Sequence, residues 1–169
     1  MSGRASAGGG TMTLVTVGAE QTRRLGEALG RVAEPGDVFL LQGPFGAGKT
    51  VFVQGLARGL DVETPVTSPS FVLASEHRGR VPLVHVDLFR VEAPEAALRA
   101  ALYDYLEGDG VCAVEWPERL ALPEGLVVTR VEIAGGDDTR RIRVTPAGAR
   151  QARALAAFAD AAGEPAVGR

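Results

Sequence analysis

Residues 43–50 constrain the fold of this chain more than any other stretch. They read Gly-Pro-Phe-Gly-Ala-Gly-Lys-Thr and match the phosphate-binding pattern Gly-x-x-x-x-Gly-Lys-Ser/Thr. An apolar run, 38–41, precedes the motif and is typical of a buried strand. After the motif, apolar residues recur at helical spacing, namely Val53, Leu56, Ala57 and Leu60. A strand, a glycine-rich loop and a helix N-terminus in this order predict a phosphate-binding loop within an α/β domain.

Lys49 supports this interpretation because it is the only lysine among 18 Lys and Arg residues. A flexible ammonium group reaches between the β- and γ-phosphates, whereas a planar guanidinium has a different shape. A single lysine also excludes a GTPase of the usual kind, because the guanine-reading sequence Asn-Lys-x-Asp would need a second one. The sequence therefore predicts a nucleoside triphosphate site that does not read guanine.

Composition sets the remaining bounds. The length of 169 residues suits one α/β domain, and a net charge of −3 shows no general footprint of nucleic-acid binding. Residues 1–12 are rich in Gly, Ser and Ala and predict a disordered tail; residues 13–146 form the expected domain, and 147–169 an Ala- and Arg-rich helix or tail. The single cysteine, Cys112, fits a small buried apolar residue in a reducing cytosol. No apolar stretch predicts a membrane span.

Strands and helices are expected to alternate along the chain. Hydrophobic periodicity predicts helices over 20–33, from residue 50 to about residue 60, and over 94–106. Short apolar or alternating runs predict strands over 14–17, 38–41, 72–74, 81–86 and 111–114, and a hairpin of 126–134 with 140–145. In the last strand, Arg141 and Arg143 alternate with Ile142 and Val144, so one face of that strand is expected to be solvated.

Two acidic residues are candidates for metal and water handling. A bound nucleotide needs Mg²⁺, which is held by the loop hydroxyl, here Thr50, and by a carboxylate at the end of a nearby strand. Asp87 and Glu115 both follow apolar runs, and their spacing does not choose between them. One is expected to support Mg²⁺ and the other to orient or activate the attacking water. His85, on the same strand face as Asp87, is expected to be a structural hydrogen-bonding residue.

A hydroxyl-rich stretch, 64–71, follows the helix of the phosphate-binding loop. Two prolines exclude a helix there and predict a shaped loop. The stretch is either a plain connector or a segment that senses the γ-phosphate and Mg²⁺ and becomes ordered when nucleotide binds.

Taken together, these segments resemble the TsaE (YjeE) family of small bacterial P-loop ATPases that act in tRNA threonylcarbamoyladenosine synthesis. The resemblance extends from about Leu14 to Thr145. It depends on five segments in the family's order: residues 43–50, V-F-V-Q-G-L-A-R-G-L at 51–60, T-S-P-S-F at 67–71, H-V-D-L-F-R at 85–90 and E-W-P-E-R at 115–119.

The resemblance implies a three-layer, P-loop NTPase-like α/β fold with a central mixed sheet flanked by helices. It implies ATP or ADP and Mg²⁺ as ligands, and slow ATP hydrolysis. Thr50 and Glu115 are then the metal ligands, and Asp87 and Lys49 the catalytic residues. The implied nucleotide contacts are Gly43, Phe45, Gly46, Ala47, Gly48, Lys49, Thr50, Val51, Thr16, Thr67, Ser68 and Ser70.

The implied partners are TsaB-like and TsaD-like proteins, whose complex transfers the threonylcarbamoyl group to the adenosine beside the anticodon. The ATPase would reset this complex in the cytoplasm, without reading nucleic acid sequence itself and without a membrane. Some positions differ from the family pattern: Pro44-Phe45 replaces Asp-Leu, Ser70 replaces Thr, Phe89 replaces Tyr, and Gly18 and Gln21 differ within the N-terminal segment.

Two alternatives to the ATPase remain open at this point. A small-molecule kinase could use the same loop, although it would need an acceptor pocket and an arginine-rich lid, for which 78–80 or 140–143 could be argued. A nucleotide-sensing partner protein without catalysis would not need both Asp87 and Glu115.

Overall fold

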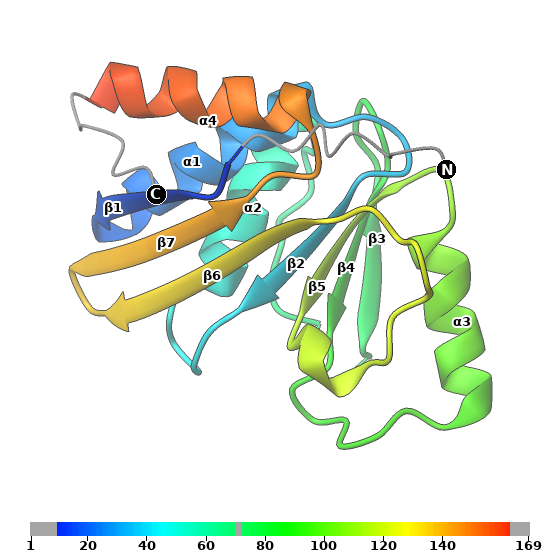
Figure 1. The fold of residues 1–169 in the computed structure, drawn as a ribbon. Coiled ribbons are helices and arrows are strands. Elements are labelled where there is room, and N and C mark those ends of the chain that lie inside the picture. Colours follow the sequence, from blue (N-terminus) through cyan, green and yellow to red (C-terminus); the bar gives the residue numbers. More distant parts are fainter. Residues whose placement is uncertain (1–9, 70–71, 163–169) are drawn as a thin grey trace, which may run out of the picture.

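The computed structural model describes residues 10–69 and 72–162, which fold around one mixed sheet of seven strands. The strand order is β1-β7-β6-β2-β5-β4-β3 (Figure 1). The strands are β1 (Met12–Val17), β2 (Val38–Gln42), β3 (Ala74–His77), β4 (Leu83–Asp87), β5 (Val111–Glu115), β6 (Thr129–Gly136) and β7 (Thr139–Thr145). The helices are α1 (Gly18–Val32), α2 (Lys49–Gly59), α3 (Ala96–Leu106), the short 3₁₀ helix η1 (Pro117–Arg119) and α4 (Ala149–Ala162).

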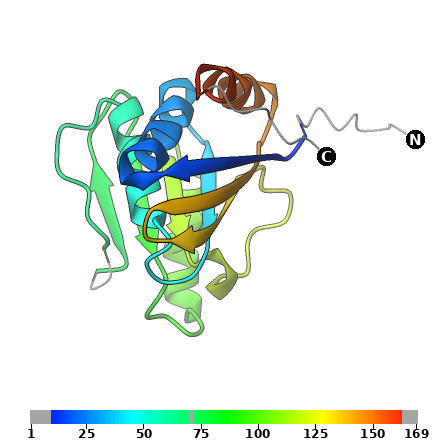
Figure 2. The ribbon, with the colours of Figure 1, turned by 90° about the vertical axis from the view of Figure 1, so that its left-hand side faces the viewer.

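Helices cover both faces of the sheet, so the predicted three-layer α/β architecture is confirmed. Alternate residues of β2 point to opposite faces: Phe39 and Leu41 pack beneath α1, α2 and α4, whereas Val38 and Leu40 pack beneath α3. Figure 2 shows α4 and α1 together on one side of the twisted sheet, with β1 at its edge. No helix in the described part of the chain is long and apolar enough to cross a membrane.

Four neighbouring parallel strands, β6, β2, β5 and β4, position the site. β2 pairs in parallel with β5 and β6, and β4 pairs in parallel with β5, so the carboxyl ends of all four lie at the same edge. Asp87 and Glu115 are direct partners in the register of β4 and β5, and Leu41 of β2 lies opposite Glu115. The two acidic strand ends therefore lie side by side, on the same side of the loop that follows β2.

Several element boundaries differ from the sequence expectation. The strand predicted over 72–74 begins only at Ala74, because the N–H of Leu73 bonds Pro69 O in a turn, where Leu73 has φ 67°. The predicted strand 81–86 is Leu83–Asp87, and the first hairpin strand begins at Thr129 rather than Leu126. Met12, expected in the tail, is the first residue of β1 and pairs with Val144.

The C-terminal helix belongs to the same core as the rest of the domain. Leu155 and Ala159 of α4 are each only 1% exposed and join the cluster under α1 and α2. The guanidinium of Arg150 donates to both carboxylate oxygens of Asp37, at 2.7 and 3.1 Å. Of the predicted helix or tail over 147–169, residues 149–162 are thus a helix packed on the core, and residues 163–169 lie outside the described part of the chain.

Candidate nucleotide-binding site

The loop 43–48 has the backbone that a phosphate-binding loop requires. Gly43 and Gly48 both have positive φ, 153° and 107°. A Cβ at Gly43 would lie 2.4 Å from the backbone oxygen of Ile133, and one at Gly48 would lie 2.7 Å from Nε of Arg140. Only glycine fits at these positions, and α2 begins directly afterwards at Lys49, so the N–H groups of its first turn face the loop.

Lys49 is buried although it carries a charge, and only 5% of its surface is exposed. Its ammonium donates to the backbone oxygens of Gly43 and Pro44, the latter at 2.9 Å, and lies 4.3 Å from the centre of the Trp116 ring. Burial lowers the pKa of Lys49, and the negative charge of Glu115 is the largest opposing influence.

Glu115 is held by two donors on one oxygen. The hydroxyl of Thr50 donates to Glu115 Oε1 at 2.8 Å, and Nε2 of His85 lies 2.9 Å from the same atom. A carboxylate only accepts, so His85 carries its proton on Nε2 and donates. His85 is fully buried and, as expected from the sequence, is a hydrogen-bonding residue; its partner is the acid on the neighbouring strand. This hydrogen bond fixes the orientation of the Glu115 carboxylate.

Asp87 is the second acid and is 4% exposed. Its Oδ1 accepts the backbone N–H of Phe89 at 2.9 Å, and its Oδ2 accepts the hydroxyl of Ser68 at 2.5 Å. Ser68 comes from the hydroxyl-rich stretch after α2. This bond ties that stretch to the acid at the end of β4.

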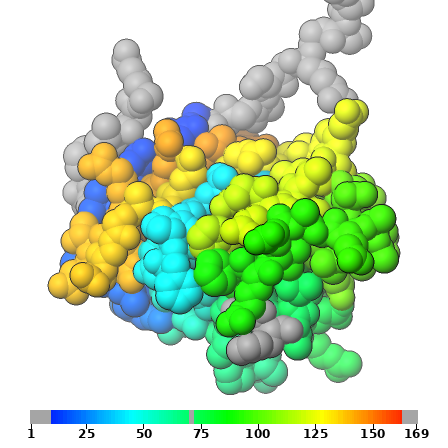
Figure 3. Space-filling model, turned by 90° about the horizontal axis from the view of Figure 1, so that it is seen from below, coloured from blue at the N-terminus to red at the C-terminus, as the bar shows by residue number. Residues whose placement is uncertain are grey.

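A cavity of about 420 Å³ brings these groups together. Figure 3 shows the cyan surface between β2 and α2 lying between the yellow-to-orange β6–β7 hairpin and the green segment after β4. The cavity lies at the loop edge of the sheet and is lined by Phe45, Gly46, Gly48, Lys49, Thr50, Val51, Ser68, Asp87, Phe89, Glu115, Trp116 and Arg140. The lining thus combines a glycine loop, two cations, two acids and an aromatic wall.

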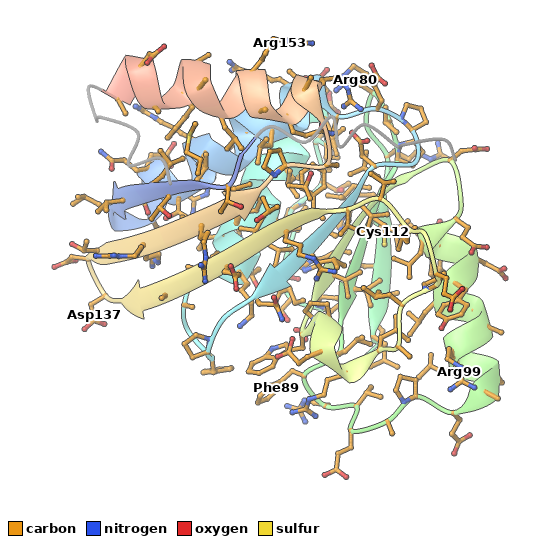
Figure 4. All side chains as sticks on the ribbon, in the orientation of Figure 1. Arg80, Phe89, Arg99, Cys112, Asp137 and Arg153 are labelled. Atoms are coloured by element: carbon orange, nitrogen blue, oxygen red, sulfur yellow. The ribbon has the colours of Figure 1, made fainter. Side chains whose placement is uncertain are left out.

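The aromatic wall stands at the mouth of the cavity. The ring centres of Phe45 and Phe89 are 5.6 Å apart, and those of Phe89 and Trp116 are 5.1 Å apart. Phe45 is 82% exposed, and Figure 4 shows Phe89 below the loop that follows β2. Trp116 packs on Lys49 at the inner end, so its indole reports on the environment of the lysine.

The residues present fit a magnesium ion held together with a nucleotide. Thr50 and Glu115 supply oxygen ligands 2.8 Å from each other, and Asp87 lies beside them in register. In the described part of the chain no group of three or more His, Cys, Asp or Glu residues could hold a metal alone. Mg²⁺ does not require such a cage, because it is commonly bound through one or two protein oxygens together with water and substrate phosphates.

Most of the residues proposed from the sequence line this cavity or form its loop. Thr16 does not line it: it is buried on β1, and its hydroxyl lies 2.7 Å from that of Thr22. Thr67 lines a separate hollow beside Arg23 and Gln54. Ser70 lies outside the described residues. As nucleotide contacts, all three stay predictions.

Three lining residues, Phe89, Trp116 and Arg140, were not among the site residues predicted from the sequence, where Arg140 was considered only as part of a kinase lid. The sequence pattern of β7 indicates that Arg140 is buried. Arg140 shares the buried face with Ile142 and Val144, whereas Arg141 and Arg143 point outward. A charged residue in phase with the apolar positions indicates a buried cation.

Comparisons with known proteins agree on one family. A family model described as "Threonylcarbamoyl adenosine biosynthesis protein TsaE" matches residues 16–143. A Treponema pallidum protein named tRNA threonylcarbamoyladenosine biosynthesis protein TsaE is 40% identical over 135 residues, covering 79% of this chain and 99% of that protein. The protein of the same name from Mycobacterium tuberculosis is 44% identical over 144 residues, covering 79% of this chain and 84% of that protein.

A solved structure gives the same match in three dimensions. The crystal structure of Bacillus subtilis YdiB superimposes with a TM-score of 0.67 at 32% sequence identity. The match covers 90% of this chain and 96% of that chain.

Proposed function

Because the chain belongs to the TsaE family of tRNA threonylcarbamoyladenosine biosynthesis proteins, we propose that it binds ATP with Mg²⁺ and hydrolyses it slowly. The observation that carries this proposal is the convergence of Lys49, Thr50, Asp87 and Glu115 on one cavity behind a phosphate-binding loop. These groups supply the parts that phosphoryl transfer needs, namely positioning and compensation of charge.

Each residue has a role in this proposal. The N–H groups at the start of α2 and the ammonium of Lys49 bind the phosphates. Thr50 and Glu115 hold Mg²⁺, which neutralises charge on the phosphate oxygens when bound. Asp87 orients the attacking water and accepts its proton, and the Ser68 hydroxyl holds the carboxylate in place.

We propose that hydrolysis resets a complex of TsaB-like and TsaD-like proteins in the cytoplasm, and that those proteins perform the transfer to tRNA. The bond between Ser68 and Asp87 supports a switch, because it couples the stretch after α2 to the group that faces the γ-phosphate. A partner that contacts this stretch would therefore respond to the bound nucleotide.

The test is an ATP-binding and hydrolysis assay of the whole chain, with and without the two partner proteins. Wild-type protein is expected to bind ATP only with Mg²⁺ present and to release phosphate slowly, faster with its partners. Lys49→Ala removes the only ammonium in the loop and is expected to weaken ATP binding about tenfold or more. Unchanged binding by Lys49→Ala would refute the assignment of the loop, and phosphate transfer to a small acceptor would favour a kinase.

A further inference from the structure

Arg140 is held against the phosphate-binding loop from the side of the sheet. It is 8% exposed on β7, and its Nε donates to the backbone oxygen of Ala47 at 2.9 Å. The same side chain packs closely on Gly48, where an added Cβ would lie 2.7 Å from Nε of Arg140. The guanidinium therefore lies against Ala47 and Gly48, in the part of the loop whose backbone N–H groups are expected to bind phosphate.

The charge of Arg140 has no counterpart in the part of the protein that the structure describes. No carboxylate there forms an ion pair with it, and its Nη1 is buried without a hydrogen-bond acceptor. By contrast, Arg150, on α4, is paired with Asp37. A buried cation without a partner is costly for a folded protein. Such a cost points to an anionic ligand that supplies the missing charge.

The charges of the cavity lead to the same conclusion. Its lining contains two cations, Lys49 and Arg140, and two anions, Asp87 and Glu115. Arg140 stands on the other side of the loop from the two acids' strands, on the β6–β7 hairpin. It is thus a second cation, besides Lys49, that a triphosphate in the cavity can use.

We propose that Arg140 is a nucleotide-binding residue, a second cation of the phosphate site that neutralises the phosphate charge from the side of the sheet. It also holds the loop in its phosphate-binding shape through Ala47. The ligand class is a nucleoside di- or triphosphate. This inference rests on the ATP binding proposed above and adds to it a residue that lies 91 positions after Lys49 in the sequence (140 − 49).

The experiment measures the Kd of ATP with Mg²⁺ from the fluorescence of Trp116, the only tryptophan, which lines the cavity. Arg140→Gln keeps an amide donor for Ala47 but removes the charge, and Arg140→Lys keeps the charge but removes the planar fork. We expect Arg140→Gln to weaken ATP binding about tenfold or more, and Arg140→Lys to weaken it less. Arg141→Gln is the matched control, because Arg141 is exposed on the same strand; it should bind ATP within about twofold of wild type.

Melting temperatures without nucleotide separate a ligand role from a structural one. Because no carboxylate among the described residues pairs with the buried Arg140, Arg140→Gln is expected to melt no lower than wild type, while the upward shift caused by ATP becomes smaller. Wild-type-like binding by Arg140→Gln, or an equal loss in the Lys and Gln variants, would overturn this inference alone. Absence of ATP binding by wild-type protein would overturn the proposed function and this inference together.

Discussion

At the scale of single residues, two hydrogen bonds of the site end on the same carboxylate oxygen. Glu115 Oε1 accepts from both Thr50 and His85, so the loop hydroxyl, the acid and the buried histidine form one unit. Two donors on one oxygen fix the rotation of the carboxylate before any ion arrives. Asp87 is fixed separately, by Ser68 and by the N–H of Phe89. The two acids therefore have different surroundings although their strands are neighbours.

This difference predicts different effects of removing each charge. Asp87→Asn keeps the shape and an acceptor for the Phe89 N–H, so ATP should bind within about threefold of wild type. Hydrolysis should fall about 10²-fold or more, because a general base is lost. Glu115→Gln should instead raise the Mg²⁺ concentration needed for ATP binding at least about tenfold. Magnesium titrations of ATP binding, combined with single-turnover rates of hydrolysis, check both variants. If Asp87→Asn raised the Mg²⁺ requirement and Glu115→Gln only slowed hydrolysis, Asp87 would be the metal ligand and Glu115 the general base.

The residues of the site could largely be predicted from the sequence, but residue patterns alone did not pair Thr50 with Glu115; only the family resemblance implied that pair. The loop motif and the two strand-end acids are local patterns, so Lys49, Thr50, Asp87 and Glu115 were found. The choice of Glu115 as the partner of Thr50 depends on the strand order β2-β5-β4, which no local pattern encodes. Arg140 was not predicted as a contact of the loop, because it is distant from the loop in the sequence. Only the folding of the β6–β7 hairpin brings it to Ala47.

At the scale of elements, α1 and α2 cross unusually closely because both helices carry glycines at the contact. A Cβ at Gly26 of α1 would lie 2.3 Å from the backbone oxygen of Phe52, and one at Gly55 of α2 would lie 2.0 Å from that of Arg23. Both obstacles are backbone atoms, which cannot turn aside as a flexible side chain can. Periodicity predicted both helices, but a glycine within a helical pattern does not reveal which surface it approaches.

The close crossing predicts the sign of a substitution. In an exposed helix, alanine in place of glycine stabilises by up to about 1 kcal/mol. Gly55→Ala should instead lower the free energy of unfolding by about 1–3 kcal/mol or more, because the helices must separate. It should also weaken ATP binding, since α2 carries the loop at its N-terminus. Urea denaturation and ATP titration measure the two effects.

The matched control is Gly136→Ala at the end of β6, where an added Cβ meets nothing within 4 Å. It should change the free energy of unfolding by less than about 0.5 kcal/mol. Equal stability of the Gly55 and Gly136 variants would show that the helices do not cross as closely as described.

At the scale of the whole molecule, the C-terminal helix closes the core over α1. The sequence of residues 147–169 is rich in Ala and Arg and lies outside the family resemblance, so it gave little reason to expect tight packing. The structure places Leu155 and Ala159 of α4 in the same cluster as Leu25 and Leu29 of α1. Packing of this kind depends on distant apolar partners, which composition alone does not identify.

A substitution on each face of α4 tests whether this helix is part of the folding unit. Leu155 is 1% exposed, so Leu155→Ala should lower the free energy of unfolding by about 2–5 kcal/mol through the cavity that it leaves. Arg153→Ala, on the outward face of α4 that Figure 4 displays, should change it by less than about 0.5 kcal/mol. Circular dichroism and Trp116 fluorescence should follow one common urea transition in both variants, because α4 unfolds together with the site. Separate transitions, or a Leu155 variant as stable as the Arg153 variant, would make α4 an appendage rather than a part of the nucleotide-binding domain.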